Sequence, residues 1–113
     1  MSGRRETVAV VVVTYNRADL LGRTLDGLAA QSREPDAVIV VDNASEDHTR
    51  DVLDAHLGLR LQRIHLESNT GGAGGFRAGV SSAFDQGFDR IWLMDDDVVP
   101  APDCLATLMA QDE

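Results

Sequence analysis

Residues 90–97 read Arg-Ile-Trp-Leu-Met-Asp-Asp-Asp, so that a short apolar run ends directly in three consecutive aspartates. A short apolar run bounded by polar residues is typical of a buried β-strand. The same arrangement occurs at residues 7–14, which precede Tyr-Asn-Arg, and at residues 37–41, which precede Asp-Asn. Both of these runs are apolar on their two faces, as expected for central strands of a parallel sheet.

Helical patterns separate these strands. Asn16 is expected to cap a first helix and Ser45 a second one at residues 46–56. Further along, the sequence predicts a strand at 59–66, a glycine-rich loop at 69–75, a helix from Phe76 onward and a last short helix at 103–110. Strands that alternate with helices predict a three-layer α/β/α fold with a mostly parallel sheet.

The composition excludes several classes of protein. Nineteen acidic residues stand against ten basic ones, all of them arginine, and the formal net charge is −9. Such a surface does not neutralise phosphates, so we expect no nucleic-acid partner, and a divalent cation is the more natural ligand. The single cysteine, Cys104, excludes an internal disulfide. The longest apolar run, residues 8–13, is far too short to span a bilayer.

In parallel α/β sheets, ligands bind beyond the carboxyl ends of the strands. The most polar and glycine-rich segments of the chain follow the predicted strands at this end. They are Thr14-Tyr15-Asn16-Arg17, Asp42-Asn43, residues 69–75 and Asp95-Asp96-Asp97. We therefore expect these four segments to meet at one edge of the sheet, which we call the rim.

The three aspartates carry the strongest chemical signal. Adjacent carboxylates repel one another at the end of a buried strand unless water or a cation relieves the repulsion. In an extended stretch Asp95 and Asp97 point to one side and Asp96 to the other, so the outer pair could hold a hard divalent ion. The alternative interpretation is a solvated acidic turn or a helix cap.

Each of the other rim segments also allows two interpretations. Asp42 could accept a hydrogen bond from a nucleobase or a ribose, or it could form only an Asx turn. Tyr15 could stack on a base and Arg17 could pair with a phosphate, or the two could be a packed tyrosine and a surface arginine. The glycine-rich segment could donate amides to a phosphate, or it could be a tight turn with positive φ values.

Two groups of residues are given no role in ligand binding. Asp47 is expected to lie in the first turn of its helix and to interact favourably with the helix dipole. The histidines His48, His56 and His65 show no spacing typical of metal ligands.

Together the four motifs resemble the inverting family 2 glycosyltransferases, which have the GT-A fold. The motifs are Val-Val-Val-Thr-Tyr-Asn-Arg, Val-Ile-Val-Val-Asp-Asn-Ala-Ser, Asn-Thr-Gly-Gly-Ala-Gly-Gly-Phe and Trp-Leu-Met-Asp-Asp-Asp. The glycine-rich segment and the triple aspartate are most similar to the rhamnosyl- and galactofuranosyltransferase branch. The resemblance covers nearly the whole chain.

This resemblance implies a nucleotide-diphosphate sugar as the donor and a Mg²⁺ or Mn²⁺ ion as the cofactor. Asp95 and Asp97 would hold the ion and the diphosphate, with Asp96 near the donor sugar. Asp42, or Asn43 beside it, would read the nucleobase. The other residues that would line the nucleotide are Thr14, Tyr15, Arg17 and Gly72.

The chain departs from the family pattern after the aspartates. In the family the acceptor site and the catalytic base follow this motif, whereas the sequence ends at Glu113. No base is assignable among Asp103, Asp112 and Glu113. We therefore expect residues 1–113 to be the nucleotide-sugar-binding portion of a GT-A domain, with the base beyond Glu113. The missing half would bind a glycan or lipid-linked acceptor.

Two other functions remain open. A metal-dependent sugar nucleotidyltransferase shares the donor-binding half, and a basic glycine-rich loop after the first strand would favour it. A catalytically silent nucleotide-binding module would account for the missing second half. A phospho-receiver domain is disfavoured because the chain contains no lysine.

Two expectations concern assembly and location. A half-domain leaves a sheet edge uncovered, and uncovered edges invite pairing, so we expect a homodimer. We expect a cytoplasmic location, with contact to the inner face of the membrane made only through regions missing from this chain.

Overall fold

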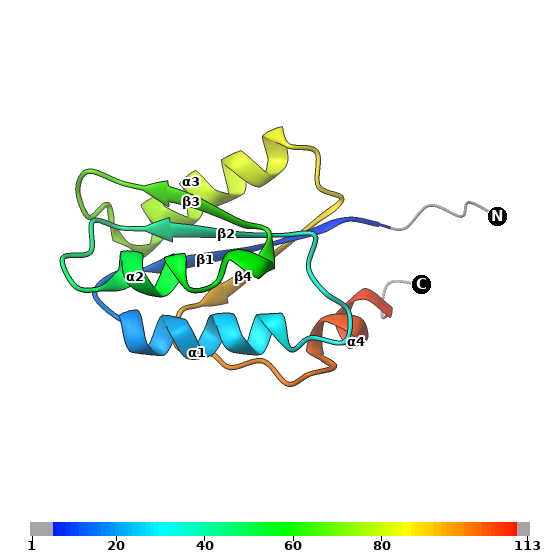
Figure 1. Ribbon diagram of the computed structural model, residues 1–113. Coiled ribbons are helices and arrows are strands. Elements are labelled where there is room, and N and C mark those ends of the chain that lie inside the picture. Colours follow the sequence, from blue (N-terminus) through cyan, green and yellow to red (C-terminus); the bar gives the residue numbers. More distant parts are fainter. Residues whose placement is uncertain (1–5, 111–113) are drawn as a thin grey trace.

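The computed structural model of the protein describes residues 6–110. Strands alternate with helices along the chain, as the sequence predicts (Figure 1). The bounds are β1 Val8–Thr14, α1 Ala18–Ala29, β2 Ala37–Asp42, α2 Thr49–Asp54, the short 3₁₀ turn η1 Leu57–Leu59, β3 Leu61–His65, α3 Gly71–Asp85, β4 Arg90–Asp95 and α4 Cys104–Ala110. None of the helices between residues 6 and 110 has the length and apolar character of a membrane-spanning segment.

The four strands form one parallel sheet in the order β3-β2-β1-β4. Thr14 pairs with Asp42, and Asp42 pairs with His65 on its other side. On β4, Asp95 pairs with Val13. The carboxyl ends of the strands therefore lie along one edge, on the left of Figure 1.

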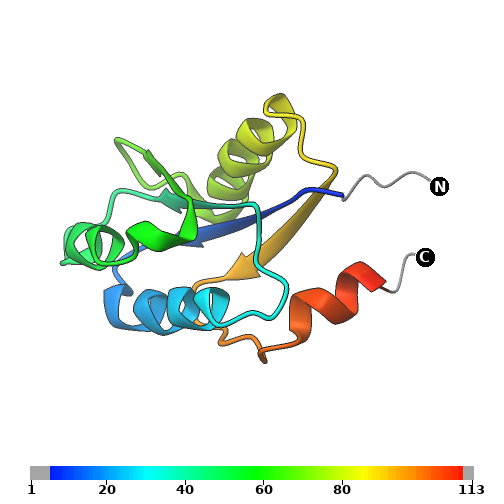
Figure 2. The same ribbon diagram turned by 45° about the vertical axis from the view of Figure 1, so that its right-hand side comes forward.

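Helices cover both faces of this sheet, so the predicted three-layer α/β class is confirmed. α1 and α2 lie on one face and α3 on the other (Figures 1 and 2). Successive side chains of β1 point to opposite faces, as in any strand. Val10 and Val12 pack with the buried leucines of α1, whereas Ala9 and Val11 pack with Ala83 of α3.

The glycine-rich segment is the beginning of a helix, not the loop that the sequence predicts. α3 starts at Gly71, and Gly71 is the only glycine of the segment with a positive φ, +77°. A Cβ atom at Gly75 would lie 2.5 Å from Cγ1 of Val13, and one at Gly79 would overlap Val11. The absence of side chains at these two positions lets α3 pack directly onto β1.

Asp47, rather than the residues that the sequence predicts, holds the starts of α1 and α2. The Ala18 N–H donates to Oδ2 of Asp47 at 3.1 Å, and the Thr49 N–H donates to Oδ1 at 3.1 Å. The prediction that Asn16 and Ser45 cap these helices is wrong. Instead, the Asn16 N–H donates to the Ser45 hydroxyl at 2.9 Å, and this contact joins the loops after β1 and β2.

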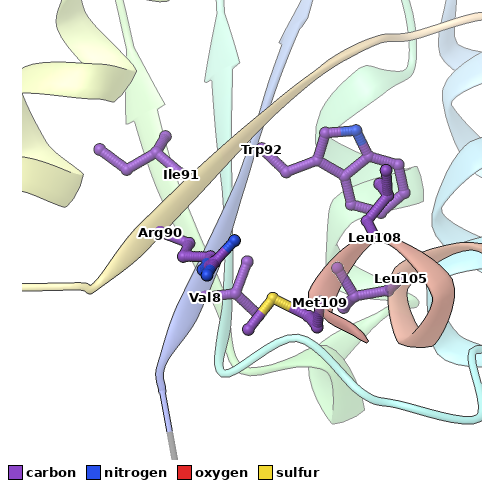
Figure 3. A pocket seen from close by; sticks show the side chains of 7 residues that line it. All are labelled: Val8, Arg90, Ile91, Trp92, Leu105, Leu108 and Met109. Carbon is purple, nitrogen blue, oxygen red and sulfur yellow. The ribbon is translucent and has the colours of Figure 1, made fainter. Parts of the chain in front are cut away.

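α4 lies at the end of the sheet opposite the rim. Together with the beginnings of β1 and β4 it forms an apolar groove of about 270 Å³ (Figure 3). The lining residues are Val8, Arg90, Ile91, Trp92, Leu105, Leu108 and Met109. β4 is an edge strand, with β1 as its one strand partner among residues 6–110. The groove therefore adjoins an open strand edge.

Candidate functional site

Thr14, at the end of β1, contacts Asp96, just beyond the end of β4. The Thr14 hydroxyl donates to Oδ2 of Asp96 at 2.9 Å, and both side chains are buried. β1 has β2 on one side and β4 on the other, so the strand order reverses at β1. Such a reversal is where open α/β sheets bind ligands. The prediction that rim segments meet is therefore confirmed for the segments that follow β1 and β4.

The three aspartates do not form the extended stretch that the sequence predicts. β4 ends at Asp95, and Asp96 and Asp97 form a turn because Asp96 points inward to the end of β1. Exposure still alternates, since Asp95 and Asp97 are exposed and Asp96 is buried. The Thr24 hydroxyl of α1 lies 2.7 Å from the Val98 carbonyl oxygen and holds the chain that leaves the turn.

Arg17 is the residue immediately before α1, and its side chain extends over this turn. Its Nη1 atom lies 3.3 Å from Oδ1 of Asp96 and 3.7 Å from Oδ2 of Asp97. The two oxygens of Asp96 are thus occupied by the Thr14 hydroxyl and by the guanidinium. A buried carboxylate is tolerated only when it is paired and hydrogen-bonded, and Asp96 meets both conditions.

Asp42, a candidate reader of the nucleobase, is buried. Its Oδ1 accepts the Ser45 N–H at 2.9 Å, in the manner of the Asx turn that the sequence allows. Its Oδ2 lies 3.3 Å from Nδ1 of His65. Sequence reasoning assigned no role to His65, because the contact depends on the register that pairs it with Asp42.

Asn43 ties the end of β2 to the start of α3. Its buried side chain accepts the Thr70 N–H at 2.8 Å through Oδ1 and donates to the Gly71 carbonyl oxygen at 2.9 Å through Nδ2. Its own N–H donates to the Thr14 carbonyl oxygen at 2.9 Å. Asn43 therefore fixes three rim segments relative to one another, a role that spacing alone did not indicate.

A cleft of about 300 Å³ opens between these segments. Of the predicted site residues, only Asp42 and Asp97 do not line it: Asp42 is buried, and Asp97 is exposed beside Arg17. Phe76 of α3 packs partly against the core and also lines the cleft. The complete lining is Val13, Thr14, Tyr15, Arg17, Asn43, Asn69, Gly71, Gly72, Phe76, Asp95 and Asp96.

Asp95 and Asp97 offer part of the donor set that a hard divalent ion requires, namely two exposed carboxylates with one residue between them in the sequence. Within residues 6–110, no group of three or more His, Cys, Asp or Glu side chains is placed to hold a metal ion. An ion here would need further oxygen ligands from outside the chain. Mg²⁺ commonly binds in this way, through one or two carboxylates together with substrate phosphates and water. The residues fit an ion that binds together with phosphate.

The carboxyl of Asp47 has a lowered pKa. Burial raises this pKa, but hydrogen bonds from the Thr49 hydroxyl and from the N–H groups of Ala18 and Thr49, together with nearby His48, bring it below its ordinary value of 3.8. The structural role predicted for Asp47 is confirmed, although the residue precedes α2 rather than lying in its first turn.

Fold and site together define a parallel α/β domain with a polar cleft where the strand order reverses. Residues 9–112 match the family described as Glycosyl transferase family 2. The chain is 43% identical over 108 residues to the galactofuranosyltransferase GlfT1 of Mycolicibacterium smegmatis, a match that covers 93% of this chain and 35% of that protein. The chain thus belongs to glycosyltransferase family 2. It spans about a third of the length of the curated relatives that it matches first.

Solved structures of other proteins share the fold. S. aureus TarS in complex with UDP-GlcNAc matches with a TM-score of 0.83 at 27% identity, over 92% of this chain and 30% of that chain. The mannosyltransferase PcManGT from Pyrobaculum calidifontis, in complex with GDP-Man and Mn²⁺, matches with a TM-score of 0.76 at 30% identity. That match covers 95% of this chain and 32% of the other. The GT-A fold that the resemblance implies is confirmed.

Proposed function

We propose that this chain is the donor-binding portion of a metal-dependent glycosyltransferase, which transfers a sugar from a nucleotide-diphosphate sugar with inversion. The observation that carries the proposal is the contact between Thr14 and Asp96. It joins the end of β1 and the aspartate turn in one cleft, beside Arg17. A hydroxyl, a guanidinium and carboxylates in one cleft suit a charged nucleotide and a cation.

The nucleotide is proposed to lie along the rim. Tyr15 is 42% exposed and offers its ring to the base. Asn43 lines the cleft and Asp42 does not, so Asn43 is proposed to face the base, although both side chains are buried and hydrogen-bonded within the chain. Gly72 lies in the first turn of α3, where the missing side chain lets a ribose or a phosphate approach the backbone.

Asp95 and Asp97 are proposed to hold a Mg²⁺ or Mn²⁺ ion together with the diphosphate. When bound, such an ion stabilises the negative charge that the leaving diphosphate gains. The complex of PcManGT with GDP-Man and Mn²⁺ supports this choice of ion. Asp96 keeps the turn in position and is proposed to lie near the donor sugar.

We further propose that the sugar is galactofuranose carried by UDP. The relatives named galactofuranosyltransferase GlfT1 are 43% and 45% identical to this chain, and the TarS complex contains a UDP-sugar. The acceptor, a glycan or a lipid-linked glycan, and the base that deprotonates its hydroxyl are proposed to belong to sequence beyond Glu113. Asp112 and Glu113 lie outside the described residues.

Calorimetry with UDP and GDP, with and without Mn²⁺, tests donor binding. We expect UDP to bind more tightly when Mn²⁺ is present, and we expect Asp95→Asn and Asp97→Asn to abolish this dependence. Asp103→Asn, an exposed change beside α4, serves as the matched control and should leave binding unchanged. A folded wild-type chain that binds neither Mn²⁺ nor a nucleotide would contradict the proposal.

Activity separates the proposed function from its alternatives. A chain extended beyond residue 113 should transfer a sugar to an acceptor and release a nucleoside diphosphate. Release of pyrophosphate from a nucleoside triphosphate and a sugar phosphate would indicate a nucleotidyltransferase. Nucleotide binding without either reaction in the extended chain would indicate a silent module.

We also propose that this chain self-associates as a homodimer through the outer edge of β4. Leu93 is 49% exposed on this strand, and the apolar groove beside α4 adjoins it (Figure 3). Such an open edge favours pairing with a second copy. Analytical ultracentrifugation at roughly tens of micromolar protein tests this proposal, and a result that shows only monomer would contradict it.

We propose a cytoplasmic location for the protein. A nucleotide-diphosphate sugar is highly charged and does not cross a bilayer unaided, so the donor and the cleft must share a compartment. Any contact with the inner face of the membrane is proposed to be made by regions outside this chain.

A further inference from the structure

Arg17 supplies the positive charge that faces the aspartate turn. Its Nη1 atom is 3.3 Å from Asp96 and 3.7 Å from Asp97. Among the residues that the structure describes, no other arginine or histidine pairs with these two aspartates. The guanidinium is thus the internal counter-charge of this turn.

The two contacts of Arg17 differ in strength. Asp96 is buried and is also held by the Thr14 hydroxyl, so its position is fixed. The side chains of Asp97 and Arg17 are 49% and 54% exposed, and the distance between Nη1 of Arg17 and Oδ2 of Asp97 is 3.7 Å. Ion pairs this exposed contribute little to stability, so the guanidinium can leave Asp97 at small cost.

Asp97 is also one of the two carboxylates proposed to hold the divalent ion. A guanidinium and a divalent cation repel each other at such short range, so Arg17 and the ion compete for Asp97. A nucleoside diphosphate, in contrast, has the oxygen pairs that accept a guanidinium in bidentate fashion. Arg17 therefore has a better partner once a diphosphate is in the cleft.

We propose that Arg17 couples the binding of the cation to the binding of the donor diphosphate. Arg17 pairs with Asp97 in the free chain, leaves Asp97 when a divalent ion is bound, and then pairs with the diphosphate. The inference rests on the proposed function and deepens it. Because binding linkage is reciprocal, the nucleotide raises the affinity for the cation by the same factor as the cation raises the affinity for the nucleotide.

Calorimetry of Mn²⁺ binding to the full chain, without nucleotide and with saturating UDP, tests the coupling. Arg17→Gln removes the charge and keeps most of the side-chain length. We expect this variant to bind Mn²⁺ alone about two- to fivefold more tightly than the wild type, because an exposed competing ion pair is lost. We expect UDP to raise the Mn²⁺ affinity of the variant less than that of the wild type.

Three controls accompany this measurement. Arg23→Gln removes an equal charge from the exposed side of α1 and should leave both Mn²⁺ affinities unchanged, which controls for the greater negative charge of the chain. Arg17→Lys keeps the competing charge but not the bidentate geometry, so it should bind Mn²⁺ alone like the wild type and show weaker coupling to UDP. Uridine, which lacks phosphate, should not change Mn²⁺ affinity in any variant.

Circular dichroism tests whether each variant is folded. If Arg17→Gln does not fold, the titrations of Arg17→Lys and those with uridine test the inference instead. Unchanged or weaker binding of Mn²⁺ alone by folded Arg17→Gln overturns the inference, as does full coupling in Arg17→Lys. In both cases the wild type still binds Mn²⁺ and UDP, and the proposed function stands. A wild type that binds neither ligand overturns the proposed function, and the inference falls with it.

Discussion

Gly75 of α3 lies directly against Val13 of β1, since a Cβ atom at Gly75 would be 2.5 Å from Cγ1 of Val13. Val13 immediately precedes Thr14, which contacts the aspartate turn, and Gly75 follows the first turn of α3, which lines the cleft. The close packing of this helix on β1 therefore also sets the distance between two walls of the cleft.

Gly75→Ala should destabilise the chain. The added methyl group would overlap the Val13 side chain, and overpacking of this kind costs about 1–3 kcal/mol in the free energy of unfolding. Gly72→Ala is the matched control, because nothing lies within 4 Å of its Cβ position and alanine favours helix by up to about 1 kcal/mol. Urea denaturation measures both variants, and equal losses would refute the packing explanation.

Thr14→Val should weaken the contact between the end of β1 and the aspartate turn. The substitution keeps the branched shape and removes the hydroxyl that donates to buried Asp96. Hydrogen bonds to charged groups contribute about 1.5–3 kcal/mol, so we expect a loss of this size in the free energy of unfolding. Thr14→Ser keeps the donor and should lose clearly less; a loss as large as that of the valine variant would show that the hydroxyl is unimportant.

Asn43→Asp should be costly although the two side chains have the same shape. A carboxylate oxygen would face the Gly71 carbonyl oxygen, to which Nδ2 now donates at 2.9 Å. We expect a loss of about 1–3 kcal/mol near neutral pH. Because a protonated carboxyl can donate again, the deficit relative to wild type should shrink below about pH 4. The free energy of unfolding, measured near neutral pH and in acid, tests this mechanism. A deficit relative to wild type that does not change with pH would exclude it.

The lowered pKa of Asp47 predicts sensitivity to acid. The folded-state pKa lies below the ordinary value of 3.8, so the ionised carboxylate stabilises the folded chain. This contribution is complete above that value and is lost as the pH falls through the folded-state pKa. Asp47→Asn should therefore be less stable than wild type near pH 7, with the difference closing toward about pH 2. Glu46→Gln, an exposed neighbour, should track the wild type; a constant difference for Asp47→Asn would refute the assignment.

The fold class and the rim could be predicted because each apolar run of the sequence ends in a polar segment. Parallel topology then brings those ends to one edge. Predicting the contact between Thr14 and Asp96 would also require knowing that β4 pairs with β1. The order of the strands along the chain does not reveal this pairing. The contact between His65 and Asp42 likewise depends on strand register.

Local signals failed where tertiary contacts compete with them. Glycine has low helix propensity, so residues 71–75 look like a loop, yet packing on β1 makes them helical. Asn16 and Ser45 have the chemistry of helix caps, but the carboxylate of Asp47 reaches both helix starts in space. The extended geometry expected at Asp95–Asp97 fails because Asp96 turns inward toward Thr14.

The most direct test of the proposed site is paramagnetic broadening of backbone amide signals by substoichiometric Mn²⁺ in the presence of UDP. We expect the signals of Thr14, Gly72 and Asp96 to broaden first, because they surround one cleft, while that of Leu105 in α4 stays sharp. Broadening that begins instead around Asp26 and Asp51 on the α1–α2 face, or that affects all signals equally, would contradict a cation site at the rim.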